Sequence, residues 1–344
     1  MPVWPLKELA ESYGFRLKDY EQRGKILFLE TNTGSFALKR SNLDPAELDL
    51  EYSVFLHLLR AGCTRIARII PTATARGFAY IDGQAYLLSA WINGTHPNFT
   101  VPAEVDKAAS HLAHFHAQAQ GYTGPAYWQK RKLYGVWPYR FSYRLNHLLW
   151  YRQCVTARGI HSEFDQTFMA QVDQAIEQAQ QAITNLRVPG YYVLAEKART
   201  LGTICHHDYT YHNLLNDKED KIWLLDFDYC LLDMPLHDLG NMILHVLKLS
   251  NWSPESANRI LLMYHRERPL QQAELDALFS FVQFPQDFWQ IAWAYYAELG
   301  MHKPENLLVR LRRQVETADA RNHFLSRFAE LIKPQKFLPR RESL

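Results

Sequence analysis

Residues 204–239 contain the stretch that decides the fold: ICHHDYTYHNLL at 204–215, LLDFD at 224–228 and DMPLHDL at 233–239. Asp208 stands five residues before Asn213 and eighteen residues before Asp226. Short apolar runs at 201–205 and 222–225 flank this loop, and we expect both runs to be strand-like. The pattern predicts two carboxylates and one amide in a loop region bounded by apolar strands.

Phosphoryl transfer from ATP uses these kinds of side chain. One carboxylate accepts the proton of the attacking hydroxyl, and an Asn and a second carboxylate hold Mg²⁺ against the nucleotide phosphates. Magnesium prefers hard oxygen ligands, and the nucleotide supplies several of them. We therefore interpret Asp208 and Asn213 as catalytic residues, and Asn213 and Asp226 as metal ligands. The alternative is an ordinary loop or turn role, which Asp and Asn also favour.

These motifs carry a family resemblance. His206-His207-Asp208 followed by Asn213 resembles the catalytic loop of the aminoglycoside phosphotransferase and choline kinase group of kinase-like enzymes. The triplet at 226–228 resembles that group's metal-binding triplet, and the sequence around 205–209 is similar to that of the bacterial spore-coat CotS family. The resemblance covers about residues 20–95 and 195–245. HxDxxxxN alone is a weak signal, but its combination with DFD and an upstream Lys is specific.

The resemblance implies an α+β, two-lobed protein-kinase-like fold. Residues 1–93 would form a nucleotide-binding lobe with a small antiparallel sheet. Residues 94–344 would form a mainly helical lobe with the catalytic loop, the metal site and the acceptor region. The implied cofactors are ATP and Mg²⁺.

Neighbouring residues receive roles from the same resemblance. His206 is expected to brace the catalytic loop rather than to act as a base. His207 stands where relatives often carry Gly. Asp228 replaces the Gly of protein kinases, and it is either a further metal ligand or a residue that satisfies nearby backbone groups. Asp238 opens an apolar helix and resembles the family's buried acid, which braces the catalytic loop.

The N-terminal region is rich in strand signals. Runs at 25–30 and 35–40 are joined by Thr-Asn-Thr-Gly, which predicts a hairpin. The resemblance implies that Lys39, on the second run, contacts the α- and β-phosphates; a solvent-facing Lys is the alternative. Residues 22–24 are either a short loop over the phosphates or an ordinary turn, since GxGxxG is absent.

The next helix has a clear start. Asp44 is the expected N-cap, Pro45 fits the first helical position, and Glu47 completes a capping box. Glu51 falls on the apolar face, where an unpaired acid is costly. We expect Glu51 rather than Glu47 to pair with Lys39, because capping already occupies Glu47. The apolar face of this helix comprises Leu48, Phe55 and Leu58.

Two further strands, at 77–81 and 85–91, flank a turn signal at 82–83. The resemblance implies that the second strand leads into the segment linking the lobes. Main chain from Ser89 to Trp91 would then contact adenine. Helices are expected at 3–13, 103–120, 164–186, 254–266, 271–282, 285–300 and 304–331.

Residues 107–162 contain no Asp or Glu but many Lys, Arg, Tyr and Trp. A wall of this kind suits an anionic or sugar-like acceptor through ion pairing and ring stacking. The alternative is a basic face packed on acidic helices elsewhere. Single-stranded nucleic acid would also favour such a surface, but no binding module accompanies it.

Global properties limit the remaining possibilities. The chain has 344 residues, 47% hydrophobic and 22% charged, with a net charge of +2, so neither nucleic acid nor a membrane is an expected partner. Its four cysteines form no close-spaced pair, which is typical of a reducing compartment. No signal peptide or spanning run is evident, and we expect the cytoplasm, with the spore coat as a later location implied by the resemblance.

The leading hypothesis is an ATP-dependent kinase of a small hydroxyl-bearing molecule. The alternative is a catalytically weak or inactive scaffold of the spore coat, with other coat proteins as partners. A protein kinase is less favoured, because no recognisable activation segment follows Asp226.

Overall fold

The computed structural model describes residues 4–124, 131–298 and 300–333. Outside the undescribed positions, the chain divides into two compact units. The first takes Met1–Asn98, His114–Lys132 and Leu201–Leu232, and the second takes Phe99–Ala113, Leu133–Thr200 and Asp233–Leu344. The expected lobe boundary between residues 93 and 94 stays a prediction.

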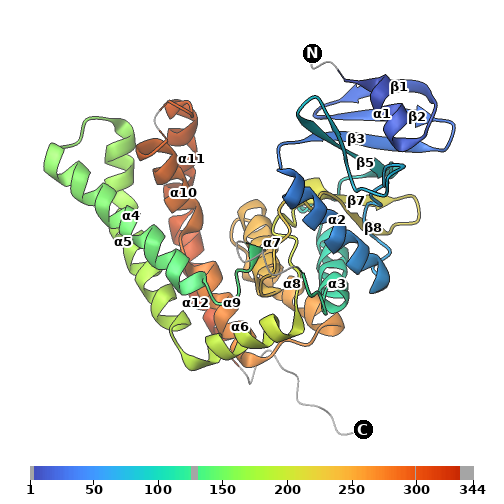
Figure 1. Cartoon of the computed structure of the whole chain (residues 1–344). Helices are drawn as coiled ribbons and strands as arrows, with labels where there is room; N and C mark the ends of the chain where they lie inside the picture. The colour runs from blue at the N-terminus through green and yellow to red at the C-terminus, as the bar shows by residue number, and fades with distance from the viewer. Residues whose placement is uncertain (1–3, 125–130, 299, 334–344) are drawn as a thin grey trace, which may run out of the picture. The chain divides into compact units, whose positions relative to one another are not determined.

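The first unit is built on a five-stranded antiparallel sheet of order β1-β2-β3-β5-β4 (Figure 1). Its strands are β1 (Leu17–Arg23), β2 (Ile26–Thr31), β3 (Ser35–Ser41), β4 (Ala79–Ile81) and β5 (Gln84–Ala90). The predicted hairpins at 25–40 and 77–91 are confirmed, and Asp82 and Gly83 turn the second one with positive φ. Strand β1 was not predicted, because its sequence LKDYEQR is almost wholly exposed and shows no apolar alternation.

One face of this sheet packs against helix α1 (Leu6–Tyr13). Alternate residues of a strand point to the same face, so Leu27 and Leu29 meet Leu9 of the helix in one core. The helix ends where expected, at Gly14, whose φ of 71° is accessible to glycine at little cost.

Helix α2 (Pro45–Arg60) begins with the predicted capping box. Asp44 accepts from the Glu47 amide at 2.8 Å, and the Glu47 carboxylate accepts from the Asp44 amide. Its buried face contains Leu48, Leu50, Glu51, Val54, Phe55 and Leu58. One charged residue, Glu51, is thus held in an apolar face.

A second sheet of the first unit has the order β6-β7-β8, with β6 (Gly94–Thr95), β7 (Leu214–Asp217) and β8 (Ile222–Leu224). The strand expected at 222–225 is confirmed, but the one expected at 201–205 is wrong. Helix α6 (Pro189–Leu201) ends at the first residue of this run, and Cys205 is the one described residue of the run in a β-bridge, with Leu231. The reason is Gly202, which has a φ of 58° and lies against the Tyr122 backbone, where a Cβ would meet the carbonyl oxygen at 2.5 Å.

The second unit is helical. Its helices are α4 (Trp137–Arg158), α5 (Glu163–Leu186), α7 (Leu236–Leu249), α8 (Pro254–Glu267), α9 (Gln272–Gln283), α10 (Gln286–Tyr296), α11 (Pro304–Glu316) and α12 (Ala318–Leu331). Helices α3 (Pro102–Gln118) and α6 (Pro189–Leu201) have residues in both units. Helices α4 and α5 run side by side (Figure 1) and share a core with α10 and α11 through Phe168, Phe288 and Leu311.

The single helix expected at 304–331 is wrong, because the chain forms two helices that meet at Thr317. This residue leaves helical geometry at ψ 5°, and its hydroxyl donates to the Arg313 carbonyl at 2.8 Å. No Gly or Pro marks the break in the sequence. The helix expected at 285–300 ends earlier, at Tyr296.

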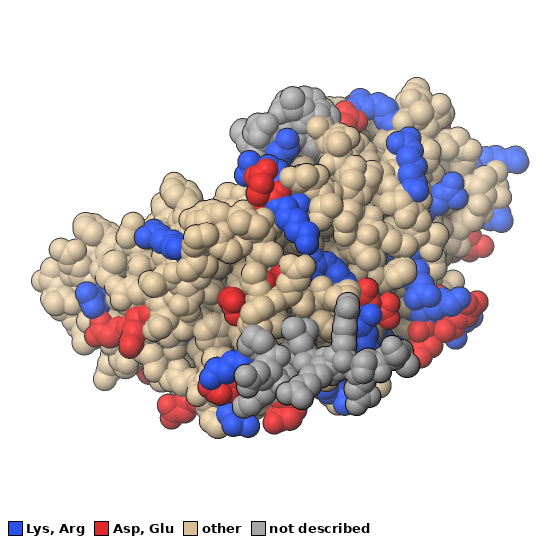
Figure 2. Space-filling view, turned by 90° about the horizontal axis from the view of Figure 1, so that it is seen from below, with Lys and Arg blue, Asp and Glu red and all other residues tan. Residues whose placement is uncertain are grey.

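Across the described residues, no helix is both long and apolar enough to cross a membrane. On the face shown in Figure 2, Lys and Arg side chains are interspersed with Asp and Glu side chains. This distribution agrees with a net charge of only +2.

Candidate nucleotide and metal site

His206 organises the loop that precedes Asp208. Its ring is fully buried, and Nε2 lies 2.8 Å from the Leu225 carbonyl oxygen. Because a carbonyl can only accept, Nε2 carries the proton, and Nδ1 accepts from the Asp208 amide at 3.3 Å. The neutral imidazole thus ties the loop to the strand end before Asp226, which is the bracing role expected from the sequence.

Asn213 closes the loop onto Asp208. Its Nδ2 donates to Asp208 Oδ2 at 2.7 Å and to the Asp208 carbonyl at 2.9 Å. The main-chain carbonyl of Asn213 accepts from the Leu225 amide at 2.9 Å. With Nδ2 used by Asp208, the atom that Asn213 can offer to a cation is Oδ1.

Two residues of this region adopt left-handed backbone conformations. His207 has a φ of 65° and Asp226 a φ of 59°. Non-glycine residues rarely take such values, and Asp tolerates them better than most. The positive φ explains why Gly suits the position of His207. Strained backbone also clusters at functional sites.

Lys39 extends from β3 to the triplet at 226–228. Its Nζ donates to Asp226 Oδ1 and to Asp228 Oδ2, both at 2.7 Å. Among the described residues, Lys39 forms ion pairs with these two aspartates and with no other acid. The expected pair with Glu51 is therefore not formed in this structure. Two carboxylates attract the ammonium more strongly than one buried carboxyl does.

Glu51 lies close to this cluster, but its burial favours the protonated form of the carboxyl group. Its side chain is 5% exposed, and Oε2 has no hydrogen-bond partner in the described chain. Burial raises the pKa of Glu51 to about 8, Asp228 adds to the rise, and Lys39 and Arg131 oppose it. Glu51 is therefore largely protonated at neutral pH without a ligand.

The two aspartates of the triplet differ as well. Burial alone would raise both pKa values, but the adjacent Lys39 lowers the pKa of Asp226 below its ordinary value. The pKa of Asp228 stays raised, because burial and repulsion from Asp226 outweigh Lys39 there. Asp228 Oδ1 is buried without a hydrogen-bond partner. The site therefore contains an oxygen that lacks a cation or a donor.

The sequence reasoning missed Arg131. Its guanidinium donates to the Asp228 carbonyl at 3.2 Å and to Glu47 Oε1 at 2.6 Å. It connects the start of α2 to the triplet at 226–228. The absence of acids from residues 107–162 was the available signal, since an Arg in such a segment must find its acid elsewhere.

Other cations of that segment are also engaged. Arg152 pairs with Asp173 and Arg158 with Asp165, both on α5. These pairs favour the alternative stated above, a basic face packed on an acidic helix. Tyr127, Trp128 and Lys130 of this segment lie outside the described residues.

A cavity of about 530 Å³ brings these groups together, and its described lining comes entirely from the first unit. Its polar lining includes Lys39, Glu51, Ser89, Asn213, Asp226 and Asp228, and its apolar lining includes Ile26, Ala37, Ile69, Leu87, Trp91, Leu215 and Leu225. Asp208 is not in the lining and reaches it through Asn213. The volume lies in the range of small-molecule sites.

The donor set fits Mg²⁺. Asn213, Asp226 and Asp228 provide hard oxygen ligands, and Asp228 Oδ1 lacks a partner. Asp226 and Asp228 outnumber the one lysine that pairs with both, so the site would favour a bound cation.

Ser89 and Trp91 line the cavity, but their main-chain groups pair with β3. Ser89 pairs with Ala37, and the Trp91 amide donates to the Ser35 carbonyl at 3.0 Å. Successive strand residues face opposite edges, so the Ala90 carbonyl and the Ile92 amide turn away from β3. The Ile92 amide has no hydrogen-bond partner among residues 4–124, 131–298 and 300–333.

This fold is the protein-kinase-like fold. The structure matches an aminoglycoside phosphotransferase from Alicyclobacillus acidocaldarius subsp. acidocaldarius DSM 446 with a TM-score of 0.85, at 22% identity, covering 96% of this chain and 97% of that one. It also matches a spectinomycin phosphotransferase solved with ADP and spectinomycin, with a TM-score of 0.59 at 15% identity, covering 98% and 97%. The predicted fold class is thereby confirmed.

The chain belongs to the family described as "Spore coat putative kinase YutH", whose model matches residues 6–328. It is 24% identical over 338 residues to Spore coat protein S of Bacillus subtilis (strain 168), covering 96% of this chain and 95% of that protein. The resemblance to a spore-coat family within the kinase-like group is confirmed.

Proposed function

We propose that the protein is an ATP-dependent phosphotransferase that moves the γ-phosphoryl group to a hydroxyl of a small molecule. The observation that carries this proposal is the meeting of Lys39, Asn213, Asp226 and Asp228 in one cavity. The fold supports it, since related folds include phosphotransferases, one of them solved with ADP.

In this proposal Asp208 orients the acceptor hydroxyl and takes its proton. The hydrogen bond from Asn213 Nδ2 holds the Asp208 carboxylate in place. Asn213 Oδ1, Asp226 and Asp228 hold Mg²⁺, which supplies charge neutralisation to the phosphates when bound. Most of the rate enhancement would come from positioning and charge.

Lys39 changes partners in this proposal. With Asp226 and Asp228 holding a cation, the Lys39 ammonium would be free to hold the α- and β-phosphates. Glu51 then serves as the nearby carboxylate that positions it. This exchange would turn an ion-paired resting site into a nucleotide site.

Adenine would bind at the end of β5, beside Ser89 and Trp91. We assign its hydrogen bonds to the Ala90 carbonyl and the Ile92 amide, because the Trp91 amide is already paired with β3. Ser89 and Trp91 would then contribute packing from the cavity wall.

The acceptor we propose is anionic or sugar-like, and the proposed location is the spore coat, with other coat proteins as partners. The acceptor class rests on the basic aromatic composition of residues 107–162, of which Arg131, Arg152 and Arg158 already have acid partners. The location rests on the family and on the likeness to Spore coat protein S.

Thermal melting with ATP and Mg²⁺ tests the nucleotide site. A ligand that binds only the folded state raises the melting temperature. The wild type should show a rise that needs Mg²⁺, and Asp226→Asn should show none. Asp208→Asn should keep the rise but lose phosphoryl transfer. Transfer at the full rate by Asp208→Asn would contradict the proposed mechanism.

A second candidate is a kinase-shaped scaffold of the spore coat. The observation that favours it is the double ion pair of Lys39, which occupies the carboxylates that a metal ion needs. The same melting experiment separates the two. The scaffold is favoured if the melting temperature does not change at millimolar ATP and Mg²⁺ in the wild type or in Asp226→Asn.

A further inference from the structure

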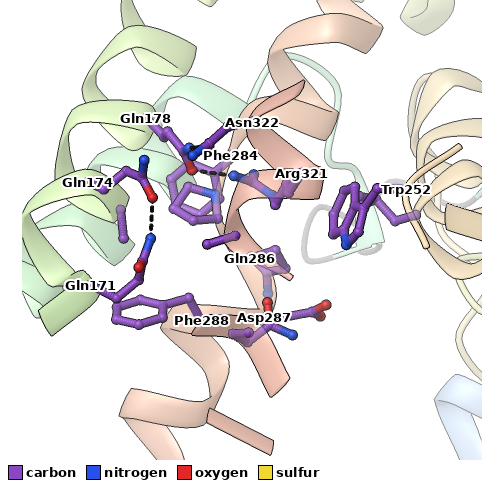
Figure 3. Close-up of a pocket in the computed structure, with 15 residues that line it drawn as sticks. Gln171, Gln174, Gln178, Trp252, Phe284, Gln286, Asp287, Phe288, Arg321 and Asn322 are labelled. Carbon is purple, nitrogen blue, oxygen red and sulfur yellow. Dashed lines mark hydrogen bonds between the residues drawn. The ribbon is translucent and has the colours of Figure 1, made fainter. Parts of the chain in front are cut away.

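A second cavity, of about 40 Å³, lies within the second unit among α5, α10, α11 and α12 (Figure 3). Its apolar wall includes Leu244, Trp252, Phe284 and Phe288. Its polar wall includes Gln171, Gln174, Gln178, Gln286, Asp287, Gln314, Arg321 and Asn322. None of the residues that form the nucleotide cavity takes part.

Arg321 is the cation of this cavity. It donates to Gln178 Oε1 and to the Gln283 carbonyl, the latter at 2.7 Å. It forms no ion pair with any carboxylate in the described chain. Burial lowers the pKa of Arg321 to about 10, and the nearby charge of Asp287 offsets only part of that effect. A guanidinium placed in this way lacks a counter-ion.

The arginine fixes the direction of the adjacent amides. Arginine can only donate, so the atom of Gln178 that meets Arg321 must be its oxygen. Gln178 Nε2 therefore donates to Asn322 Oδ1 at 2.8 Å. What Asn322 has left is Nδ2, a donor. Figure 3 shows the three side-chain ends converging.

A second arginine fixes Gln286 by the same argument. Arg144 Nη1 donates to Gln286 Oε1 at 2.6 Å, so the free group of Gln286 is its Nε2 donor. Arg144 also has no carboxylate partner among the residues described here, and its guanidinium lies 4.7 Å from the Trp289 ring centre. Gln171 and Gln174 bond each other and offer one donor and one acceptor in either orientation.

The acid in the polar wall, Asp287, already has an ion-pair partner. Its carboxylate pairs with Lys248 at 2.6 Å. The cavity therefore combines one uncompensated guanidinium with the amide donors of Asn322 and Gln286. These hydrogen-bond donors complement a ligand whose outer atoms can only accept hydrogen bonds.

We propose that this cavity binds a small oxyanion, a carboxylate or phosphate group, through Arg321, Asn322 and Gln286. A water molecule needs roughly 10–15 Å³ of such space, and the cavity of about 40 Å³ offers several times that volume. This site goes beyond the proposed phosphotransferase function and does not depend on it.

The test uses the full-length chain and measures melting temperature against sodium phosphate or sodium acetate, with sodium chloride holding ionic strength constant. The variants are Asn322→Asp and Gln286→Glu, which replace a donor by an acceptor of nearly the same shape. The control is Asn306→Asp, an exposed position on α11. The series is repeated in a Lys39→Ala background, so that phosphate at the nucleotide cavity is not counted.

The wild type and Asn306→Asp should show a saturable rise in melting temperature. In Asn322→Asp and Gln286→Glu the apparent Kd should rise at least about tenfold, as expected for losing a charge-assisted hydrogen bond and adding repulsion. The more effective salt identifies the source, phosphate or carboxylate. The proposal is overturned if phosphate and acetate raise the melting temperature no more than sodium chloride does. It is also overturned if the melting temperature rises equally in all variants.

Discussion

Lys39 Nζ lies 2.7 Å from Asp226 Oδ1, although 187 positions separate the two residues in sequence. Nζ also pairs with Asp228, so in the proposed function the ammonium would stand between the two carboxylates that Mg²⁺ needs. If that proposal holds, the lysine stabilises the ligand-free site and competes with the cation.

Replacing Lys39 with Met should expose that competition. The carboxylates of Asp226 and Asp228 lose their counter-charge, which should cost about 1–2 kcal/mol of folding free energy after allowance for partial exposure. Mg²⁺ alone should then raise the melting temperature of Lys39→Met more than that of the wild type. Lys18→Met, on an exposed strand position, is the control. Equal Mg²⁺ responses would contradict the exchange.

Glu51 should make stability depend on pH. Its folded pKa of about 8 lies above the ordinary value of 4.5, so the folded state holds the proton more tightly. Without Mg²⁺, its contribution is fully present below pH 4.5 and is lost as pH rises through 8, by at most about 1.4 kcal/mol per pH unit. Glu51→Gln should remove this slope in urea unfolding at pH 5 to 9, whereas Glu30→Gln should not.

Arg131 should position the metal site. Arg131→Met loses the bonds to Glu47 and to the Asp228 carbonyl, which should cost about 1–2 kcal/mol. It should also reduce the Mg²⁺-dependent shift in melting temperature. Arg152→Met loses an exposed ion pair and should change stability by less than about 0.5 kcal/mol. An unchanged Mg²⁺ shift in Arg131→Met would leave Arg131 a purely structural residue.

His206 should matter through packing and hydrogen bonds. His206→Ala leaves the Leu225 carbonyl and the Asp208 amide without a partner in a buried place, which should cost about 3 kcal/mol. His212→Ala, at an exposed ring, should cost little. Urea denaturation of both variants measures the difference, and similar losses would refute the bracing role.

The Ile92 amide should bind adenine. Ile92→Pro removes the N–H, whereas Ile92→Ala keeps it and shortens only the side chain. Titration with ATP and Mg²⁺ should show about tenfold weaker binding for the proline variant than for the alanine variant. Melting without ligand checks that both variants fold. Equal affinities would place the adenine contact elsewhere.

Much of the fold was accessible from sequence because its signals are local. The capping box at Asp44 and the turn at Asp82 each depend on residues within a few positions of one another. The break at Thr317 was missed, because the separate packing of two helices decides it rather than any turn residue. Strand β1 was missed for a related reason, since its pairing with β2 needs no apolar face of its own.

The sequence by itself determined which chemical groups the site contains and the spacing of Asp208, Asn213 and Asp226. Local chain geometry sets these features, and they also carry the family resemblance. Tertiary structure alone decided how charges pair: Lys39 with both aspartates, Arg131 with Glu47, and Glu51 left protonated. Pairing depends on distance and burial between segments far apart in the chain, and neither quantity is written in the local pattern.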